Sequence, residues 1–220
     1  MVGDTLTLSI DGTEPLTTVS VRELESVCDR AEDGHGSGVV TVRVTGAPDE
    51  GWVDGLSVSL VTKWERVLRR FERLPVATVA VASRDCGGIA LDAFLATDVR
   101  FATPDTRLLV PLDGEATWPG MTAYRLVQQA GAAHVRRAVL LGLPIEASKA
   151  LTVGLVDELT DDPDDAAKAV AKLLDRLSGK QLAIRRQLLF DAASTSFEDA
   201  LGPHLAACDR ALRRGTEAAA

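Results

Sequence analysis

The stretch that decides the fold is LPVATVAVASRDCGGIALDAFLATD, residues 74–98. Residues 76–82 form an unbroken run of small and β-branched apolar side chains. This run predicts a strand buried on both faces, because a half-exposed strand would alternate with polar residues. Gly87 and Gly88 end the first pattern, and residues 89–96 then place large apolar side chains among alanines, as a buried helix does. The stretch therefore predicts a strand, a glycine turn and a helix of an α/β protein.

The glycine turn also predicts a place for negative charge. Bare backbone amides at a helix N-terminus can hold a developing oxyanion, and Asp92 follows one turn into the expected helix. Two structural explanations compete with this functional one. Gly87 and Gly88 could allow close packing of the strand against the helix, and Asp92 could be a helix-start residue paired with Arg84.

Patterns on both sides of this stretch continue the alternation of strands and helices. The expected strands are residues 5–10, 39–44, 99–103, 107–111 and 155–159. The expected helices are residues 19–31, 61–72, 120–131, 132–141, 145–154, 166–177, 179–192 and 197–214. Ser20 and Glu23 have the spacing of a capping box at the first helix, and Pro163, within the acidic run 161–165, suits the start of a later one.

Composition excludes some classes of function. The chain has 220 residues, enough for one well-cored domain, with 46% hydrophobic and 25% charged residues. A net charge of −8 argues against nucleic acid as a partner, because phosphate binding needs a basic surface. We expect no membrane span and no signal peptide. The three cysteines are scattered, which predicts reduced thiols in a cytoplasmic protein and no metal site.

Two blocks of sequence resemble a known family. Residues 75–111, PVATVAVASRDCGGIALDAFLATDVRFATPDTRLLVP, are similar to the core signature of the crotonase (enoyl-CoA hydratase/isomerase) superfamily. Residues 118–159 are similar to the next block of that family, and the similarity extends over about residues 40–212. Within the family, the chain most resembles the small enoyl-CoA hydratase-like proteins of 3,5-dihydroxyphenylacetyl-CoA (dihydroxyphenylglycine) biosynthesis. Those proteins take part in antibiotic biosynthesis beside a type III polyketide synthase.

The resemblance implies the architecture. We expect a crotonase-like ββα spiral core in residues 1–160. Residues 161–220 are expected to form a C-terminal helical region that packs on the core or on a neighbouring subunit. Members of this family usually form trimers or paired trimers, so we expect a homo-oligomer, with a trimer favoured.

The resemblance also implies an oxyanion hole, in which two backbone amides hold the thioester carbonyl of an acyl-CoA. The first amide matches Asp54 or Gly55, and the second matches Ile89, next to Gly88. No cofactor and no metal are implied beyond the CoA thioester, which is the substrate.

Hydratases of this family use two glutamates. The first matches Asp92, and the second falls at Leu112, which cannot titrate. Asp113 is the nearest replacement, and Glu115 is a further candidate. General acid–base catalysis is worth ~10²–10⁴-fold, so the loss of one carboxylate argues against ordinary enoyl-CoA hydration.

The expected substrate-binding residues are mainly apolar: Trp52, Leu112, Trp118, Pro119 and Gly120. Trp52 could equally be a packing anchor for a shortened loop. We expect Leu112 to be part of a buried apolar wall, because residues 108–110 make the preceding strand apolar and Trp118 lies just beyond. A glutamate at position 112 would then be costly to bury.

Two functions follow from the resemblance. In the first, the protein is an enzyme that binds a polyketidyl-CoA and uses Asp92 for proton transfer during dehydration and aromatisation. In the second, it is a crotonase fold that has lost its chemistry and stimulates a type III polyketide synthase as an accessory subunit.

Overall fold

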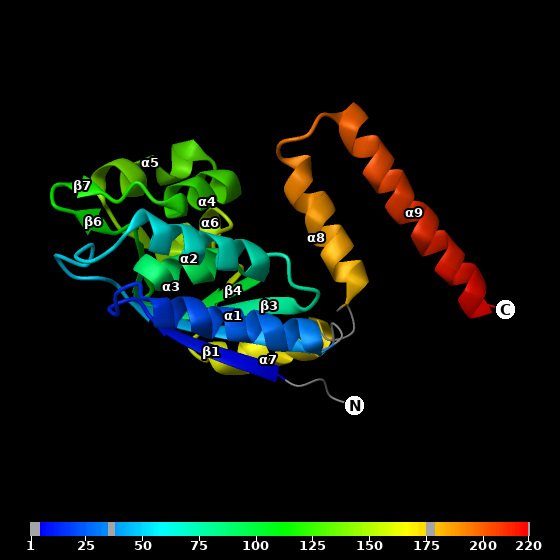
Figure 1. Cartoon of the computed structure of the whole chain (residues 1–220), viewed down its shortest axis with the longest axis horizontal. Coiled ribbons are helices and arrows are strands. Elements are labelled where there is room, and N and C mark those ends of the chain that lie inside the picture. The colour runs from blue at the N-terminus through cyan, green and yellow to red at the C-terminus, as the bar shows by residue number, and fades with distance from the viewer. Residues whose placement is uncertain (1–4, 35–37, 175–178, 220) are drawn as a thin grey trace.

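A computed structural model of the chain describes residues 5–34, 38–174 and 179–219 (Figure 1). The strands are β1 (Thr5–Asp11), β2 (Val39–Gly46), β3 (Ala77–Gly87), β4 (Val99–Ala102), β5 (Arg107–Leu109), β6 (Leu112–Asp113), β7 (Ala116–Thr117), β8 (Ile145–Glu146) and β9 (Glu158–Leu159). The helices are α1 (Thr18–Asp33), α2 (Val58–Phe71), α3 (Gly88–Leu95), α4 (Met121–Ala130), α5 (Ala132–Leu141), α6 (Ala147–Thr152), α7 (Pro163–Leu174), α8 (Lys180–Ala192) and α9 (Phe197–Ala219).

The main sheet has the order β1-β2-β3-β4-β9, and all of these neighbours run parallel. β5 extends the sheet beside the end of β3 and pairs with β8 in antiparallel direction. β6 and β7 form a separate hairpin. Helices connect the first four strands, as parallel neighbours require. The expected α/β fold with C-terminal helices is confirmed.

The central strand β3 is buried on both faces, as its apolar run predicts. Side chains along a strand point alternately to opposite faces. Ala80 and Ala82 therefore join the main core beneath α1, α2 and α3, while Val79 and Val81 join a smaller core that contains Ala167 of α7. Figure 1 shows α7 on the opposite side of the sheet from α1 and α2.

The last two helices form an antiparallel pair beside the core (Figure 1). Arg186 of α8 is buried and anchors this pair. Its guanidinium donates to the carbonyl oxygens of Leu74 and Val76 and to both carboxylate oxygens of Asp98. Asp98 also accepts from the backbone amide of Thr78 at 2.9 Å. Arg186 thus links α8 to the residues that directly precede β3 and β4.

Most expected elements are present, and the differences lie at their ends. α1 starts earlier than its apolar spacing indicates, because Thr17 is the N-cap and Ser20 completes the capping box from inside the helix. The assignment of Ser20 as N-cap was therefore wrong. Ser57 caps α2, which also starts earlier than expected. The helix expected over 145–154 has a two-residue strand before it, and the end of the helix expected over 166–177 lies outside the described residues.

Candidate active site

The glycine turn joins the most buried strand to the most buried helix. β3 ends at Gly87, and α3 begins at Gly88, whose φ of 54° lies in the left-handed region that favours glycine. A Cβ atom on Gly87 would lie 2.8 Å from the Cβ atom of Ala47, so close packing does require this glycine. The functional explanation stands beside it, because Ile89 lies in the first turn of α3, where amides have no acceptor within the helix.

Asp92 lies on α3 with its carboxylate between two other helices. Trp64 of α2 donates from Nε1 to Oδ2 at 3.1 Å, and Thr122 of α4 donates from Oγ1 to Oδ1 at 2.5 Å. The alternative that Asp92 pairs with Arg84 is wrong, because Arg84 is exposed and Trp64 and Thr122 hold the carboxylate. Burial raises the pKa of Asp92, and the Thr122 hydroxyl, the charge of Arg125 and the Trp64 indole oppose that rise.

Arg125 of α4 is buried and bound to the carboxylates of Glu65 in α2 and of Glu72, the C-cap residue of α2. Its Nη2 donates to Oε2 of Glu65 at 2.7 Å, and its Nε donates to Oε1 of Glu72 at 2.9 Å. Glu72 also accepts from Arg69. Within the described residues, the buried Nη1 of Arg125 has no hydrogen-bond partner. This network fixes α4 against α2 and places charge close to Asp92.

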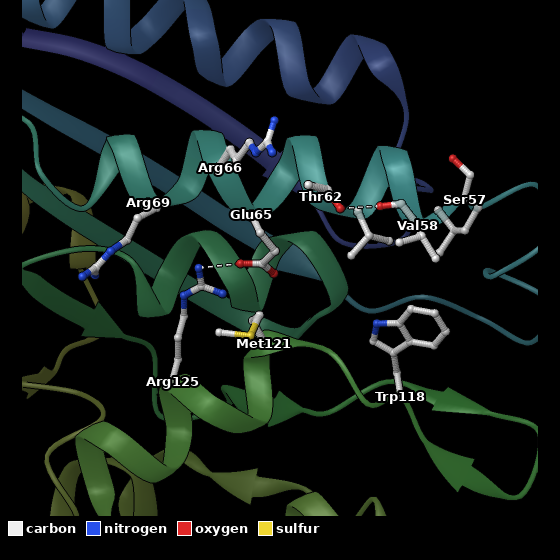
Figure 2. Close-up of a pocket in the computed structure, with 11 residues that line it drawn as sticks. Ser57, Val58, Thr62, Glu65, Arg66, Arg69, Trp118, Met121 and Arg125 are labelled. Atoms are coloured by element: carbon white, nitrogen blue, oxygen red, sulfur yellow. Dashed lines mark hydrogen bonds and ion pairs between the residues drawn. The ribbon is translucent and has the colours of Figure 1, made fainter. Parts of the chain in front are cut away.

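A cleft of about 560 Å³ opens between α2 and α4. Its apolar walls come from Leu56, Val58, Val61, Trp118 and Met121, and its polar end contains Glu65 and Arg125. Figure 2 shows Glu65 pointing from α2 toward Arg125, while Trp118 faces the start of α2. The cleft therefore suits a ligand that is mostly apolar and meets charged groups at one end.

A second recess, of about 390 Å³, lies on the other side of Trp64. It is lined by Ile89 and Trp64 together with residues at the end of β1 and the start of α1. Trp64 thus contacts this recess while it donates to Asp92 from the same side chain. The structure places the expected oxyanion amide and the expected acid on one helix beside this indole.

Of the expected substrate-binding residues, Trp118 lines the cleft. The rings of Trp52 and Trp118 meet edge to face with centroids 5.3 Å apart, and Trp52 donates from Nε1 to the carbonyl oxygen of Leu112 at 2.6 Å. Gly120 lies against the Trp118 ring, with no room for a Cβ atom. Pro119, between them, is exposed. These contacts favour the explanation of Trp52 as a packing anchor, and its role as a substrate wall stays a prediction.

Other expected site residues lie farther from the glycine turn. Asp54 and Gly55 are exposed in a turn, where the Asp54 amide donates to the carbonyl oxygen of Gly51 at 2.9 Å. The loop segment that contacts Gly88 is instead Pro48, whose Cδ would lie 3.1 Å from a Cβ atom on Gly88. The assignment of Asp54 or Gly55 as an oxyanion donor stays a prediction, and in this conformation the Asp54 amide is occupied.

The β6–β7 hairpin carries Leu112, Asp113 and Glu115, and all three are exposed. Leu112 retains 49% of its surface and lies against Gly142, whose Cβ atom would come within 2.6 Å of Leu112 Cδ2. The expectation that Leu112 belongs to a buried wall is therefore wrong. Asp113 as a replacement acid stays a prediction.

Comparison with known proteins gives the family. A protein of Amycolatopsis orientalis named Enoyl-CoA-hydratase is 59% identical over 209 residues, which are 95% of this chain and 96% of that relative. The chain belongs to the crotonase (enoyl-CoA hydratase/isomerase) superfamily. No family model matches the sequence.

Solved crotonase structures share the fold at low sequence identity. An enoyl-CoA hydratase/isomerase family protein from Silicibacter pomeroyi has a TM-score of 0.82 at 18% identity, and covers 97% of this chain and 96% of its own. An enoyl-CoA hydratase from Mycobacterium smegmatis has a TM-score of 0.82 at 16% identity, and covers 94% of this chain and 87% of its own. Among the described residues, no helix is long and apolar enough to cross a membrane.

For a crotonase, the notable residues that sequence reasoning missed are the two donors to Asp92, Trp64 and Thr122, and the neighbouring ion pair of Glu65 and Arg125. The apolar spacing of residues 61–72 places Trp64 on the buried face of its helix and gives no sign of a polar role. Glu65 and Arg125 are charged residues on amphipathic helices, a pattern that resembles a solvated face. The available signal in the sequence was that Glu65 directly follows Trp64, at the border of the apolar face.

Proposed function

We propose that the chain binds an acyl-CoA thioester and assists dehydration and aromatisation of a polyketidyl-CoA intermediate in 3,5-dihydroxyphenylacetyl-CoA biosynthesis. The observation that carries this proposal is the enclosed carboxylate of Asp92, one turn along the helix that starts with the Ile89 amide. The relative named Enoyl-CoA-hydratase supports a thioester substrate. The mainly apolar cleft supports an acyl group larger than that of crotonyl-CoA.

The residues divide the chemistry between them. The Ile89 amide, at the start of α3, stabilises the charge that develops on the thioester oxygen when a proton leaves the neighbouring carbon. A carboxylate accepts that proton. The candidates are Asp92 and the neighbouring Glu65, which is paired with Arg125. Leu112, where hydratases of the family have their second glutamate, cannot protonate a leaving hydroxyl.

The test is product formation in a reconstituted assay with the synthase. Asp92→Ala should abolish the contribution of this chain to product yield while its far-UV circular dichroism remains that of the wild type. An unchanged yield with that variant contradicts a role of Asp92 in the proposed chemistry.

The second candidate function is an accessory subunit that binds and stimulates a type III polyketide synthase without chemistry of its own. Leu112 in place of an acid and the occupied amide of Asp54 favour it. It predicts co-elution with the synthase in size-exclusion chromatography and a stimulation that survives Asp92→Ala. Separate elution together with loss of stimulation in the variant would favour the enzyme instead.

A further inference from the structure

The carboxylate that faces the α2–α4 cleft belongs to Glu65. One of its oxygens accepts from Arg125, and its side chain keeps 20% of its surface exposed. Figure 2 shows the other oxygen directed away from that guanidinium, on the side of the cleft where Met121 lies. Glu65 therefore has one oxygen that positions it and a second that a ligand can reach.

Asp92 has the opposite arrangement. Both of its oxygens accept hydrogen bonds from protein donors, and Asp92 is not among the residues that line the cleft. Its neighbour Trp64 precedes Glu65 in α2, and Thr122 precedes Arg125 by one turn of α4. The two carboxylates are thus held by adjacent positions of the same two helices.

We propose that Glu65 is a catalytic residue, the base that removes a proton from the carbon next to the thioester carbonyl of an acyl group bound in the α2–α4 cleft. This inference rests on the proposed function, because it assumes that the ligand is an acyl thioester. The C–H bond breaks, its proton passes to the free oxygen of Glu65, and its electron pair moves onto the thioester oxygen as an enolate. Return of a proton to the same carbon restores the substrate. Arg125 is the positioning residue, since its ion pair sets the direction of the Glu65 carboxylate.

The charges around Glu65 suit this role. It faces Arg125 from α4, Asp92 from α3 and Glu72 on its own helix, while Arg66 and Arg69 also border the cleft. Burial raises the pKa of Glu65, the hydrogen bond and charge of Arg125 oppose that rise, and Asp92 and Glu72 add to it. A carboxylate with a raised pKa accepts a proton more readily than an ordinary surface glutamate.

The experiment measures exchange of the α-protons of phenylacetyl-CoA for deuterium in D₂O by NMR. The wild type should exchange them at a rate that increases with pH until Glu65 is ionised. Glu65→Gln should slow the exchange by about 100-fold or more and remove that pH dependence. Binding of phenylacetyl-CoA, measured by calorimetry, should change much less. Glu65→Asp, which keeps a carboxylate, should retain the pH dependence at a reduced rate.

Glu72→Gln is the matched control, since Glu72 binds the same arginine but does not line the cleft. It should lower the melting temperature to an extent similar to Glu65→Gln and keep most of the exchange rate. Equal loss of exchange in both variants would assign Glu65 a structural role only and overturn the inference. An exchange rate in Glu65→Gln equal to that of the wild type would also overturn the inference, but it would leave the proposed function standing. A wild-type protein that catalyses neither exchange nor product formation overturns both.

Discussion

At the scale of single residues, Asp92 couples the stability of the fold to pH. Because burial raises its pKa above that of the unfolded chain, its contribution to stability is complete below the unfolded value and is lost as pH rises through the folded value. An asparagine cannot ionise. The melting temperature of Asp92→Asn minus that of the wild type should therefore increase between about pH 4 and about pH 8.

Thermal melts in a series of buffers at constant ionic strength test this prediction. Glu65 has a pKa raised in the same direction, so Glu65→Gln should show the same sign. A difference that falls with rising pH, in either variant, contradicts the argument from burial.

Leu112→Glu tests the missing second carboxylate. Leu112 is half-exposed on a hairpin, and exposed substitutions usually change the free energy of unfolding by less than about 0.5 kcal/mol. We therefore expect a melting temperature close to that of the wild type, and no crotonyl-CoA hydration, because the side chain lies against Gly142 and not at the cleft. Hydration of crotonyl-CoA by this variant would show that the hairpin can reach the substrate.

The sequence predicted Asp92 and Ile89 because both belong to one continuous strand, turn and helix. It did not predict Glu65, because the role of Glu65 depends on Arg125, which is 60 residues away on another helix. A pair of that kind becomes visible only when the packing of α2 on α4 is known. The prediction that Leu112 is buried was wrong for a related reason. The apolar residues before it suggest that the chain continues in the core, but β6 is exposed.

At the scale of elements, the attachment of α8 depends on Arg186. Removing its side chain leaves Asp98 without its cationic partner and two carbonyl oxygens without a donor. Breaking such a buried pair costs about 3–5 kcal/mol. Arg186→Ala should therefore lower the midpoint of urea unfolding strongly and increase amide exchange along α8.

The neighbouring Arg185 provides the control. It is exposed, and within the part of the chain that the structure describes it bonds to Gln181 of its own helix. Arg185→Ala should change stability by about 0.5 kcal/mol or less. Equal effects of the two substitutions would exclude a special role for Arg186.

Gly87→Ala tests the packing of β3 against the loop after β2. The added Cβ atom would lie 2.8 Å from Ala47 Cβ and 3.0 Å from the carbonyl oxygen of Leu109. Overpacking of this kind typically costs about 1–3 kcal/mol. Ala47→Gly removes the nearer atom, so the double variant should recover part of the loss in a double-mutant cycle. Strictly additive effects would contradict this contact.

The helices and long strands were largely predictable, because the spacing of their apolar residues matches the face that each one buries. The residues at which the helices begin were not predictable. Apolar spacing reports only where a helix touches the core, whereas the first turns of α1 and α2 are exposed and begin at the Thr17 and Ser57 caps. The short strand β8 depends on pairing with β5, which no local pattern encodes.

At the scale of the whole molecule, the described residues include two groups of exposed apolar side chains. One, on α4 and α5, contains Tyr124, Leu140 and Leu141, and the other, on α8 and α9, contains Leu189, Phe197, Leu201, Leu205 and Leu212. Exposed patches of this kind usually mark contacts with other chains. We predict a homo-oligomer, with a trimer favoured, by light scattering at micromolar concentration.

Paired charges should disrupt that assembly. Leu201→Glu combined with Leu205→Glu should shift the particle toward the monomer, since both side chains are exposed in the single chain and need no space in its core. A wild-type monomer contradicts the prediction. An unchanged oligomer in the double variant would exclude α9 from the contact.

The positions of the indole rings give the protein a built-in optical reporter. The chain has three tryptophans. Trp64 donates to Asp92, and Trp52 meets Trp118 edge to face beside the cleft. Trp118 lines the α2–α4 cleft and Trp64 lines the neighbouring recess, so two of the three indoles border a space that a ligand could enter. A ligand that binds in the cleft should change the tryptophan emission through Trp118, so its binding can be titrated without any attached dye.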